Sequence, residues 1–294
     1  MRHAVLFASL ALLAIAVSLA LGERWRSVEL LVIAAAVVLL GVPHGALDVI
    51  HAARRLTVKG PARWAAFVAA YVAVAALVVA GWVAAPTLAL SLFLLISALH
   101  FSGDLEEGAP RHLRALHGAA LVTLPAWFHR EDLTELFAHL VPGSGASQLV
   151  AALSTLAPAV LVLLAAVLAA GAVGRLRSAA SAPPPGALLE STATLALTLA
   201  APPLTAFAVY FCALHSARHV ARTGRVFALP GRDLLRAAAL PTLATALAVP
   251  IGLAALPDTP PDARTLQVVF IGLAALTVPH MMLIEPLRLR GWRA

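Results

Sequence analysis

Residues 64–84 of this 294-residue chain read WAAFVAAYVAVAALVVAGWVA and contain no charged side chain. An α-helix needs about 20 consecutive apolar residues to cross the hydrocarbon core of a bilayer. The stretch meets that requirement in both length and composition, whereas a globular core does not need apolar runs of this length. The sequence therefore predicts a transmembrane helix at this position.

Similar stretches recur along the whole chain. Hydrophobic residues make up 61% of the sequence and charged residues 12%, whereas a soluble domain has about 45–50% and 25%. We predict an all-α fold, a polytopic bundle of about ten transmembrane helices in which residues 1–294 form a single transmembrane domain. The ten apolar segments are residues 3–22, 28–52, 64–84, 87–103, 113–128, 147–173, 187–201, 203–222, 234–256 and 265–287.

The first segment also fits a secretory signal peptide, because Arg2 precedes an apolar stretch that ends in small residues. The apolar run is longer than the roughly 7–15 residues of a signal core. Arg24 and Arg26 follow directly, unlike a cleavage region. These features favour a membrane-spanning helix.

The basic residues predict an orientation, because cytoplasmic loops of membrane proteins are enriched in lysine and arginine. With a cytoplasmic N-terminus and ten spans, all but four of the 21 lysines and arginines fall on the cytoplasmic side. We therefore expect both termini in the cytoplasm, in a multi-pass protein of the inner cell membrane. The net charge of +7 is spread over short loops and does not indicate a nucleic-acid partner. The count places Arg288, Arg290 and Arg293 inside and Arg24, Arg26, Arg130 and Arg264 outside.

Five of the eleven histidines fall near the cytoplasmic ends of even-numbered segments. Ionisable groups are costly inside a bilayer, so they are candidates for function. Two of the five are spaced i, i+4, which places both imidazoles on one helix face. The shared depth favours a metal site over separate core histidines bonded to carbonyl groups. The five are His44, His100, His215, His219 and His280.

Imidazole ligands suit zinc, copper, iron and nickel. The chain has a single cysteine, Cys212, which excludes thiolate clusters and an internal disulfide. Four neutral imidazoles would leave Fe(II) its charge and open positions for oxygen. The predicted metal ligands are His44, His100, His215 and His219, and His280 is a possible additional ligand.

Carboxylates lie at helical spacing from these histidines. Asp48 is i+4 and His51 is i+7 from His44, and Asp104 is i+4 from His100. Ligating histidines usually donate their second N–H to a carboxylate, carbonyl or water. We expect Asp48, His51 and Asp104 to support the ligands or to bind a second metal. Asp104 can equally belong to a solvated loop.

Proline and glycine surround His44. Pro43 removes an N–H and kinks a helix, and Gly41 and Gly45 permit close approach of a neighbouring helix. Ordinary packing is the alternative explanation. The remaining histidines, among them His117 and His129, are expected to be structural.

The chain resembles the Brp/Blh family of membrane β-carotene 15,15′-dioxygenases, which is related to bacteriorhodopsin biogenesis. The matching pieces are GVPHGALD at 41–48, HF at 100–101 with Asp104, YFCALHSARH at 210–219 and PH at 279–280. The resemblance implies iron held by histidines that correspond to His44, His100, His215 and His219. It also implies β-carotene from the membrane lipid and O₂ as substrates, two molecules of retinal as product, and a retinal-binding opsin as a possible partner.

Four aromatic side chains are predicted near the level of the metal. They could bind the polyene and stabilise cationic character on it, or they could be ordinary core or lipid-facing residues. The four are Phe101, Phe207, Tyr210 and Phe211.

Two other functions compete with carotenoid cleavage. A di-iron desaturase or hydroxylase needs about eight ligands, a number reached by adding Asp48, His51, Asp104 and His280 to the four histidines. A transporter, or an assembly factor for a retinal protein, is the second competitor, because Pro43-His44 and Pro279-His280 hint at an internal repeat.

Overall fold

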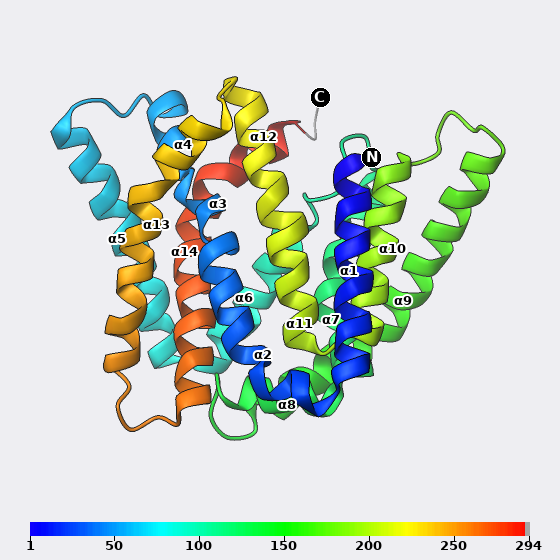
Figure 1. The fold of residues 1–294 in the computed structure, drawn as a ribbon, viewed down its shortest axis with the longest axis horizontal. Helices are drawn as coiled ribbons and strands as arrows, with labels where there is room; N and C mark the ends of the chain where they lie inside the picture. The colour runs from blue at the N-terminus through cyan, green and yellow to red at the C-terminus, as the bar shows by residue number, and fades with distance from the viewer. Residues whose placement is uncertain (292–294) are drawn as a thin grey trace.

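The computed structural model of the protein describes residues 1–291, without the side chains of Ser27 and of residues 286–291. Arg293 lies outside the described residues, as do the side chains of Arg288 and Arg290. Over residues 1–291 every regular element is a helix (Figure 1), which confirms the predicted all-α class.

The first half of the chain forms helices that run along the bundle, followed by a short helix at one end of it (Figure 1). They are α1 (Arg2–Leu21), α2 (Glu23–Ala36), the π-helix η1 (Val37–Gly41), α3 (Pro43–Ala46), α4 (Asp48–Arg55), α5 (Pro61–Ala84), α6 (Pro86–Phe101), α7 (Arg111–Phe128) and α8 (Arg130–Ala138). The second half comprises α9 (Gly145–Leu176), α10 (Pro185–Ala200), α11 (Pro203–Val209), the π-helix η2 (Tyr210–Ser216), α12 (Ala217–Phe227), α13 (Gly231–Ala254) and α14 (Pro261–Gly291).

Each predicted apolar segment coincides with a single helix or with a run of consecutive helices. We call each such helix or run a rod. The predicted segment 28–52 corresponds to consecutive pieces from α2 to α4, and 203–222 corresponds to α11, η2 and α12. No predicted apolar segment covers residues 129–146, yet the structure contains the helix α8 there. A search for long apolar runs misses α8 because it has nine residues and buries only Leu133 and Phe137.

The described chain has the properties of a multi-pass membrane protein. Six helices are long and apolar enough to cross a bilayer: α1, the rod 28–55, α5, α9, α13 and α14. Large apolar side chains such as Leu31, Val83 and Leu176 are exposed, whereas Asp48, Asp104 and Glu190 are buried. This distribution is the reverse of a soluble protein and matches a lipid environment.

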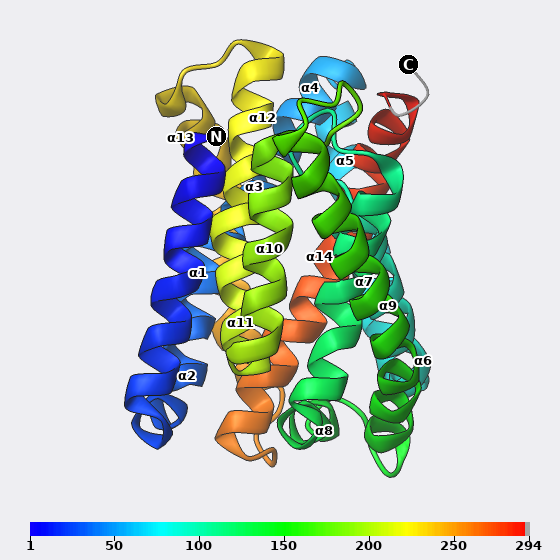
Figure 2. The same cartoon turned by 90° about the vertical axis from the view of Figure 1, so that its right-hand side faces the viewer.

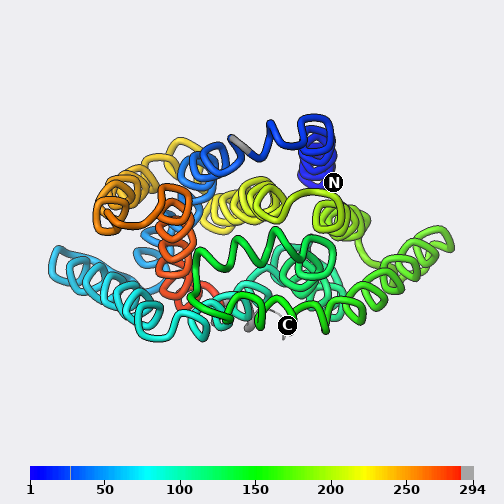
Figure 3. Tube along the Cα trace, turned by 90° about the horizontal axis from the view of Figure 1, so that it is seen from below, coloured from blue at the N-terminus to red at the C-terminus, as the bar shows by residue number. Residues whose placement is uncertain are grey.

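The bundle has two different edges. At one edge α1 packs on α10, and α7 packs on α9, α6 and α10. At the other edge α5 packs on α14 and α6, while α13 packs on α3 and α14. Figure 3, a view along the helices, shows α5 and α13 at one end of the molecule and α9 at the other. Figure 2 shows the face formed by α1, α10, α7 and α9.

The two π-helices contact each other in the interior. Single π turns inside α-helices are common at functional sites because they redirect the following side chains. A Cβ atom at Gly41 in η1 would overlap the ring of Phe211 in η2, so glycine is required for this approach. Gly45 has no atom within 4 Å of a Cβ position, and its predicted role in close packing is wrong.

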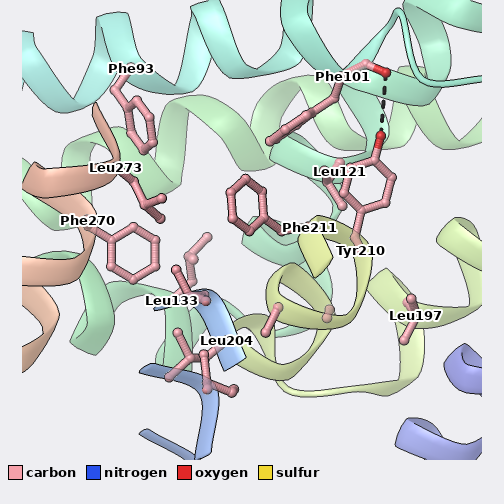
Figure 4. Packing of buried hydrophobic residues seen from close by; sticks show 14 of the residues in the cluster. Phe93, Phe101, Leu121, Leu133, Leu197, Leu204, Tyr210, Phe211, Phe270 and Leu273 are labelled. Atoms are coloured by element: carbon pink, nitrogen blue, oxygen red, sulfur yellow. Dashed lines mark hydrogen bonds between the residues drawn. The ribbon is translucent and has the colours of Figure 1, made fainter. Parts of the chain in front are cut away.

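An apolar core fills the middle of the bundle below the π-helices. In Figure 4, the rings of Phe93 of α6, Phe211 of η2 and Phe270 of α14 face a common region, and the hydroxyl of Tyr210 points to the backbone of Phe101. The histidines lie at the border of this core, so the core residues position them.

Candidate metal centre and substrate cavity

The five predicted histidines meet in one cluster, although they come from four separate rods. The centre of the His44 ring lies 4.8 Å from that of His215, 5.6 Å from His219 and 5.3 Å from His280. The His100 ring lies 4.8 Å from His215 and 5.4 Å from His280. The rings of His219 and His280 are 5.1 Å apart. The expected convergence of these side chains is therefore present in the structure.

Three of the histidines are held by buried or half-buried carboxylates through Nδ1. His215 lies 2.9 Å from Asp104, and His280 lies 2.8 Å from Asp48. His100 lies 2.8 Å from Glu285. Because a carboxylate accepts the hydrogen bond, each Nδ1 carries the proton and each Nε2 carries the lone pair.

His44 is also anchored through Nδ1, but its partner is a backbone carbonyl group. Its Nδ1 donates to the carbonyl oxygen of Gly41, and the hydroxyl oxygen of Ser216 lies 3.1 Å from the same nitrogen. The Gly41 carbonyl sits at the end of η1, so the π turn presents it to the ring. In each anchored ring, Nε2 is thus the nitrogen that can bind a metal.

Asp48 and His51 lie next to the cluster. The second oxygen of Asp48 accepts a hydrogen bond of 3.0 Å from the hydroxyl of Tyr71. His51 faces His219 at 5.8 Å between ring centres, and its Nε2 lies 3.3 Å from the hydroxyl of Thr223. Asp48 therefore anchors His280, and His51 lies at the edge of the cluster.

Asp104 is buried, and the structure does not place it in a solvated loop. The Tyr210 hydroxyl donates to its carboxylate at 2.7 Å, beside the bond from His215. The Asp104 carboxylate therefore accepts hydrogen bonds from both Tyr210 and His215.

The loop that carries Asp104 is held by arginines. Arg114 donates to the carbonyl oxygens of Leu105 and Ala109, and Arg222 donates to that of Gly103. Residues 103–109 therefore have a fixed backbone although they are not helical.

Further polar residues behind Asp104 were not found from the sequence. Arg218 forms a buried ion pair with Glu190 and donates to the carbonyl oxygen of Asp104. His117, expected to be structural, is completely buried, and its Nε2 lies 3.1 Å from the hydroxyl of Tyr210. The available signal was Glu190 itself, an ionisable residue in an apolar segment. Glu285 was missed in the same way.

No group of three or more His, Cys, Asp or Glu side chains between residues 1 and 285 is arranged with its ligating atoms around one point. However, Nε2 of His219 and Nε2 of His280 are buried without a hydrogen-bond partner. Such orphaned buried atoms need an explanation, and a bound ion is one.

The spacing of the rings supports the fit. Imidazoles bound to one metal at about 2.0–2.1 Å have ring centres roughly 5 Å apart, and the six separations above are 4.8–5.6 Å. The ring spacing therefore fits a metal with nitrogen ligands, although the ligating atoms of the described residues do not converge on one point.

A cavity of about 690 Å³ opens beside the histidines. Its walls include His44, His100, His215 and His280, and its size is within the usual range for ligand sites. Apart from the histidines and a few polar groups it is lined by apolar side chains from α5, α6, α11, α13 and α14. The cavity suits a hydrocarbon.

Three of the four predicted substrate-binding aromatics line this cavity. Phe207 stacks on Phe211 and Phe211 stacks on His215, because they are four residues apart on one rod. Phe101 contacts the His215 ring edge-on at 5.0 Å. Tyr210 is not part of the cavity wall, and its hydroxyl points toward Asp104 instead.

Comparison with known proteins identifies this arrangement. The sequence model of the β-carotene 15,15′-dioxygenase family matches residues 35–288, which include all five clustered histidines. The chain belongs to this family.

Two proteins with similar sequences carry the name of this family. A β-carotene 15,15′-dioxygenase of an uncultured marine bacterium is 29% identical over 85% of this chain and 91% of its own length. A probable β-carotene 15,15′-dioxygenase, Blh, of Halobacterium salinarum is 31% identical over 85% of this chain and 81% of its own length. No solved structure matches this member of the β-carotene 15,15′-dioxygenase family.

Proposed function

We propose that this protein cleaves β-carotene at its central double bond with O₂ and releases two molecules of retinal. One oxygen atom joins each carbon of the broken double bond, so both atoms of O₂ are used and no further reductant is required. The family membership and the names of the relatives support the reaction. The observation that carries it in the structure is an apolar cavity whose wall contains the clustered histidines.

Iron is the proposed cofactor. Fe(II) supplies the redox chemistry by which O₂ can react with a closed-shell hydrocarbon, and imidazole is a suitable ligand for it. His44, His100, His215 and His219 would hold the ion through nitrogen, with His280 as a fifth candidate. The orphaned Nε2 atoms of His219 and His280 support this assignment.

One ion is favoured over two because the carboxylates already have another role. Asp48, Asp104 and Glu285 each accept a hydrogen bond from an imidazole Nδ1. They hold the proton on Nδ1 and orient the ring. A di-iron hydroxylase would instead use carboxylates as ligands, so a metal content near two ions per chain would favour that competitor.

The substrate reaches the site from the bilayer. Val68 of α5 and Leu240 of α13 line the cavity, yet they are 53% and 75% exposed on the outer surface. The mouth of the cavity therefore lies between these two helices and faces lipid. A carotenoid can enter sideways without passing through water, and Phe101, Phe207 and Phe211 then face the polyene.

The proposed topology has ten membrane spans, both termini in the cytoplasm and an inner-membrane location. The distribution of lysine and arginine supports it. A reporter that works only in the cytoplasm should be active when it is fused to the C-terminus. A reporter that works only outside the cytoplasm should be inactive at the same position. A retinal-binding opsin is the proposed consumer of the product, and retinal transfer to a co-expressed opsin would test this.

A direct test is expression in a host that makes β-carotene, followed by chromatography of the pigments. The wild-type protein should convert β-carotene into retinal, and His215→Ala and His219→Ala should lose both retinal formation and bound iron. His112→Ala is a matched control because His112 is exposed at the start of α7. Wild-type retinal levels in either ligand variant would contradict the assignment, and unaltered β-carotene with the wild-type protein would favour a transporter or assembly factor.

A further inference from the structure

A second cavity of about 80 Å³ lies beside the first, on the side of α8. The two cavities share Phe93, Ser97, Phe101 and Phe207 in their walls. We call the smaller one the inner cavity. Because these four residues belong to both walls, the cavities are neighbours, and together they can form one path from the gap between α5 and α13 past the histidines to α8.

The floor of the inner cavity is the short helix α8. Leu133, Leu136 and Phe137 of α8 line it, and the remaining wall comes mainly from α6, α7 and α11. Figure 4 shows Leu133 and Leu204 on the far side of Phe211 from Phe101. The helix that sequence patterns missed therefore closes the path.

Hydrogen bonds fix this floor in place. Both terminal nitrogens of Arg26 in α2 contact the carboxylate of Asp132 in α8 at 2.8 Å. The side-chain amide of Gln267 in α14 donates to the carbonyl oxygen of His139 at 2.8 Å. The α8 helix and the residue that follows it thus contact two neighbouring rods, α2 and α14, and α8 can act as a stop.

The inner cavity is suited to hydrocarbon. Within the described residues its only polar side chains are Ser97 and Thr198, and Thr198 donates its hydroxyl to Leu195 of its own helix. Apolar cavities of this kind stay dry and bind apolar molecules. The volume of about 80 Å³ is several times the roughly 10–15 Å³ that a single water requires and about half of the 150 Å³ of a dry cavity that holds benzene, so the inner cavity can take the leading part of a carbon ring.

The length of the path matches half of a carotenoid. Leu204 in the wall near α8 and His215 in the cluster are eleven residues apart on one rod, or roughly 15 Å at the helical rise. An extended chain advances about 1.2 Å per bond, so the central bond of a 40-carbon polyene lies roughly 15 Å from the far end of its terminal ring.

We propose that the inner cavity receives the leading edge of the terminal ring of the carotenoid half that enters first, and that α8 sets which double bond faces the histidines. The inference rests on the proposed cleavage of β-carotene. It adds that α8 limits how far the substrate enters. When the terminal ring reaches α8, the central double bond of the carotenoid lies beside His215.

Substitutions that change the size of Leu133, on the floor of the inner cavity, test whether α8 limits the entry of the substrate. Leu133 is buried and lines the inner cavity, so Leu133→Phe should hold the ring about two bonds farther out, and Leu133→Ala should admit it deeper. Either shift moves the cut away from the centre. We expect one longer and one shorter aldehyde in place of two retinals, with the unequal pair rising at least ten-fold over wild type by chromatography.

The matched control is Ala138→Phe, since Ala138 is exposed on the same helix and does not line the cavity. It should give retinal alone. Retinal as the only product of both Leu133 variants would overturn the stop while leaving the cleavage function intact. If Leu133→Phe does not fold, the products of Leu133→Ala decide. Absence of any cleavage by the wild-type protein would instead reject the proposed function.

Discussion

The two sides of the histidine cluster differ in character. Toward α7, α10 and α12 the cluster is backed by a continuous set of hydrogen bonds through Asp104, Tyr210 and His117 and by the ion pair of Arg218 with Glu190. Toward α5 and α13 it faces the apolar cavity. The polar side keeps the rings in one orientation, and the open side leaves room for a long substrate.

This division explains how a membrane enzyme can be both rigid and accessible. Buried polar groups stabilise a structure only when they are paired, and on the polar side they are. The cavity side depends on few contacts. In α5 and in α13, only 6% of the apolar 18-residue stretch is buried inside the protein. Substitutions on the two sides should therefore affect different measurements.

The largest effect is expected from the ion pair on the polar side. Glu190→Ala leaves the guanidinium of Arg218 buried without its counter-charge, and such a change costs about 3–5 kcal/mol of stability. Thermal unfolding in detergent measures it. Glu107→Ala is the control, because the Glu107–Arg225 pair is exposed and pairs of that kind contribute about 0–1 kcal/mol. Equal stability of the two variants would show that the polar side is not needed for folding.

A smaller effect is expected at Asp104. Asp104→Asn keeps the shape but weakens the acceptor for His215, and loss of such partners typically lowers metal affinity about 10- to 100-fold. Iron affinity measured by competition with a chelator should fall while the helix content remains the same. Wild-type affinity in this variant would mean that His215 does not depend on Asp104.

The smallest effect is expected on the open side. Ala244 of α13 lines the cavity and is exposed, so Ala244→Phe should narrow the mouth without touching a histidine. We expect KM for β-carotene to rise about three- to ten-fold, at most about 1.4 kcal/mol, with unchanged iron content. Lost iron in Ala244→Phe would show that the two sides are not independent.

The fold was predictable where apolar runs are long, because a bilayer imposes a length on each helix. Shared depth was enough to bring His44, His100, His215, His219 and His280 into one cluster. The α8 helix was not predictable in this way, since its nine residues alternate charge with a few buried side chains.

The supporting residues depended on side-chain directions that sequence spacing does not fix. Asp104 was paired by spacing with His100, four residues away, but it contacts His215. His100 is held instead by Glu285, which lies 185 positions later. Asp48 likewise anchors His280 rather than His44. In each case the partner comes from a different rod, so packing decides the contact.

X-ray absorption at the iron edge of the purified protein tests the central claim most directly. The account predicts about one iron per chain, with nitrogen ligands near 2.1 Å and the scattering pattern of at least four imidazoles, and fewer imidazoles in His219→Ala. An active protein without iron, or with fewer than three imidazoles on the metal, would contradict it.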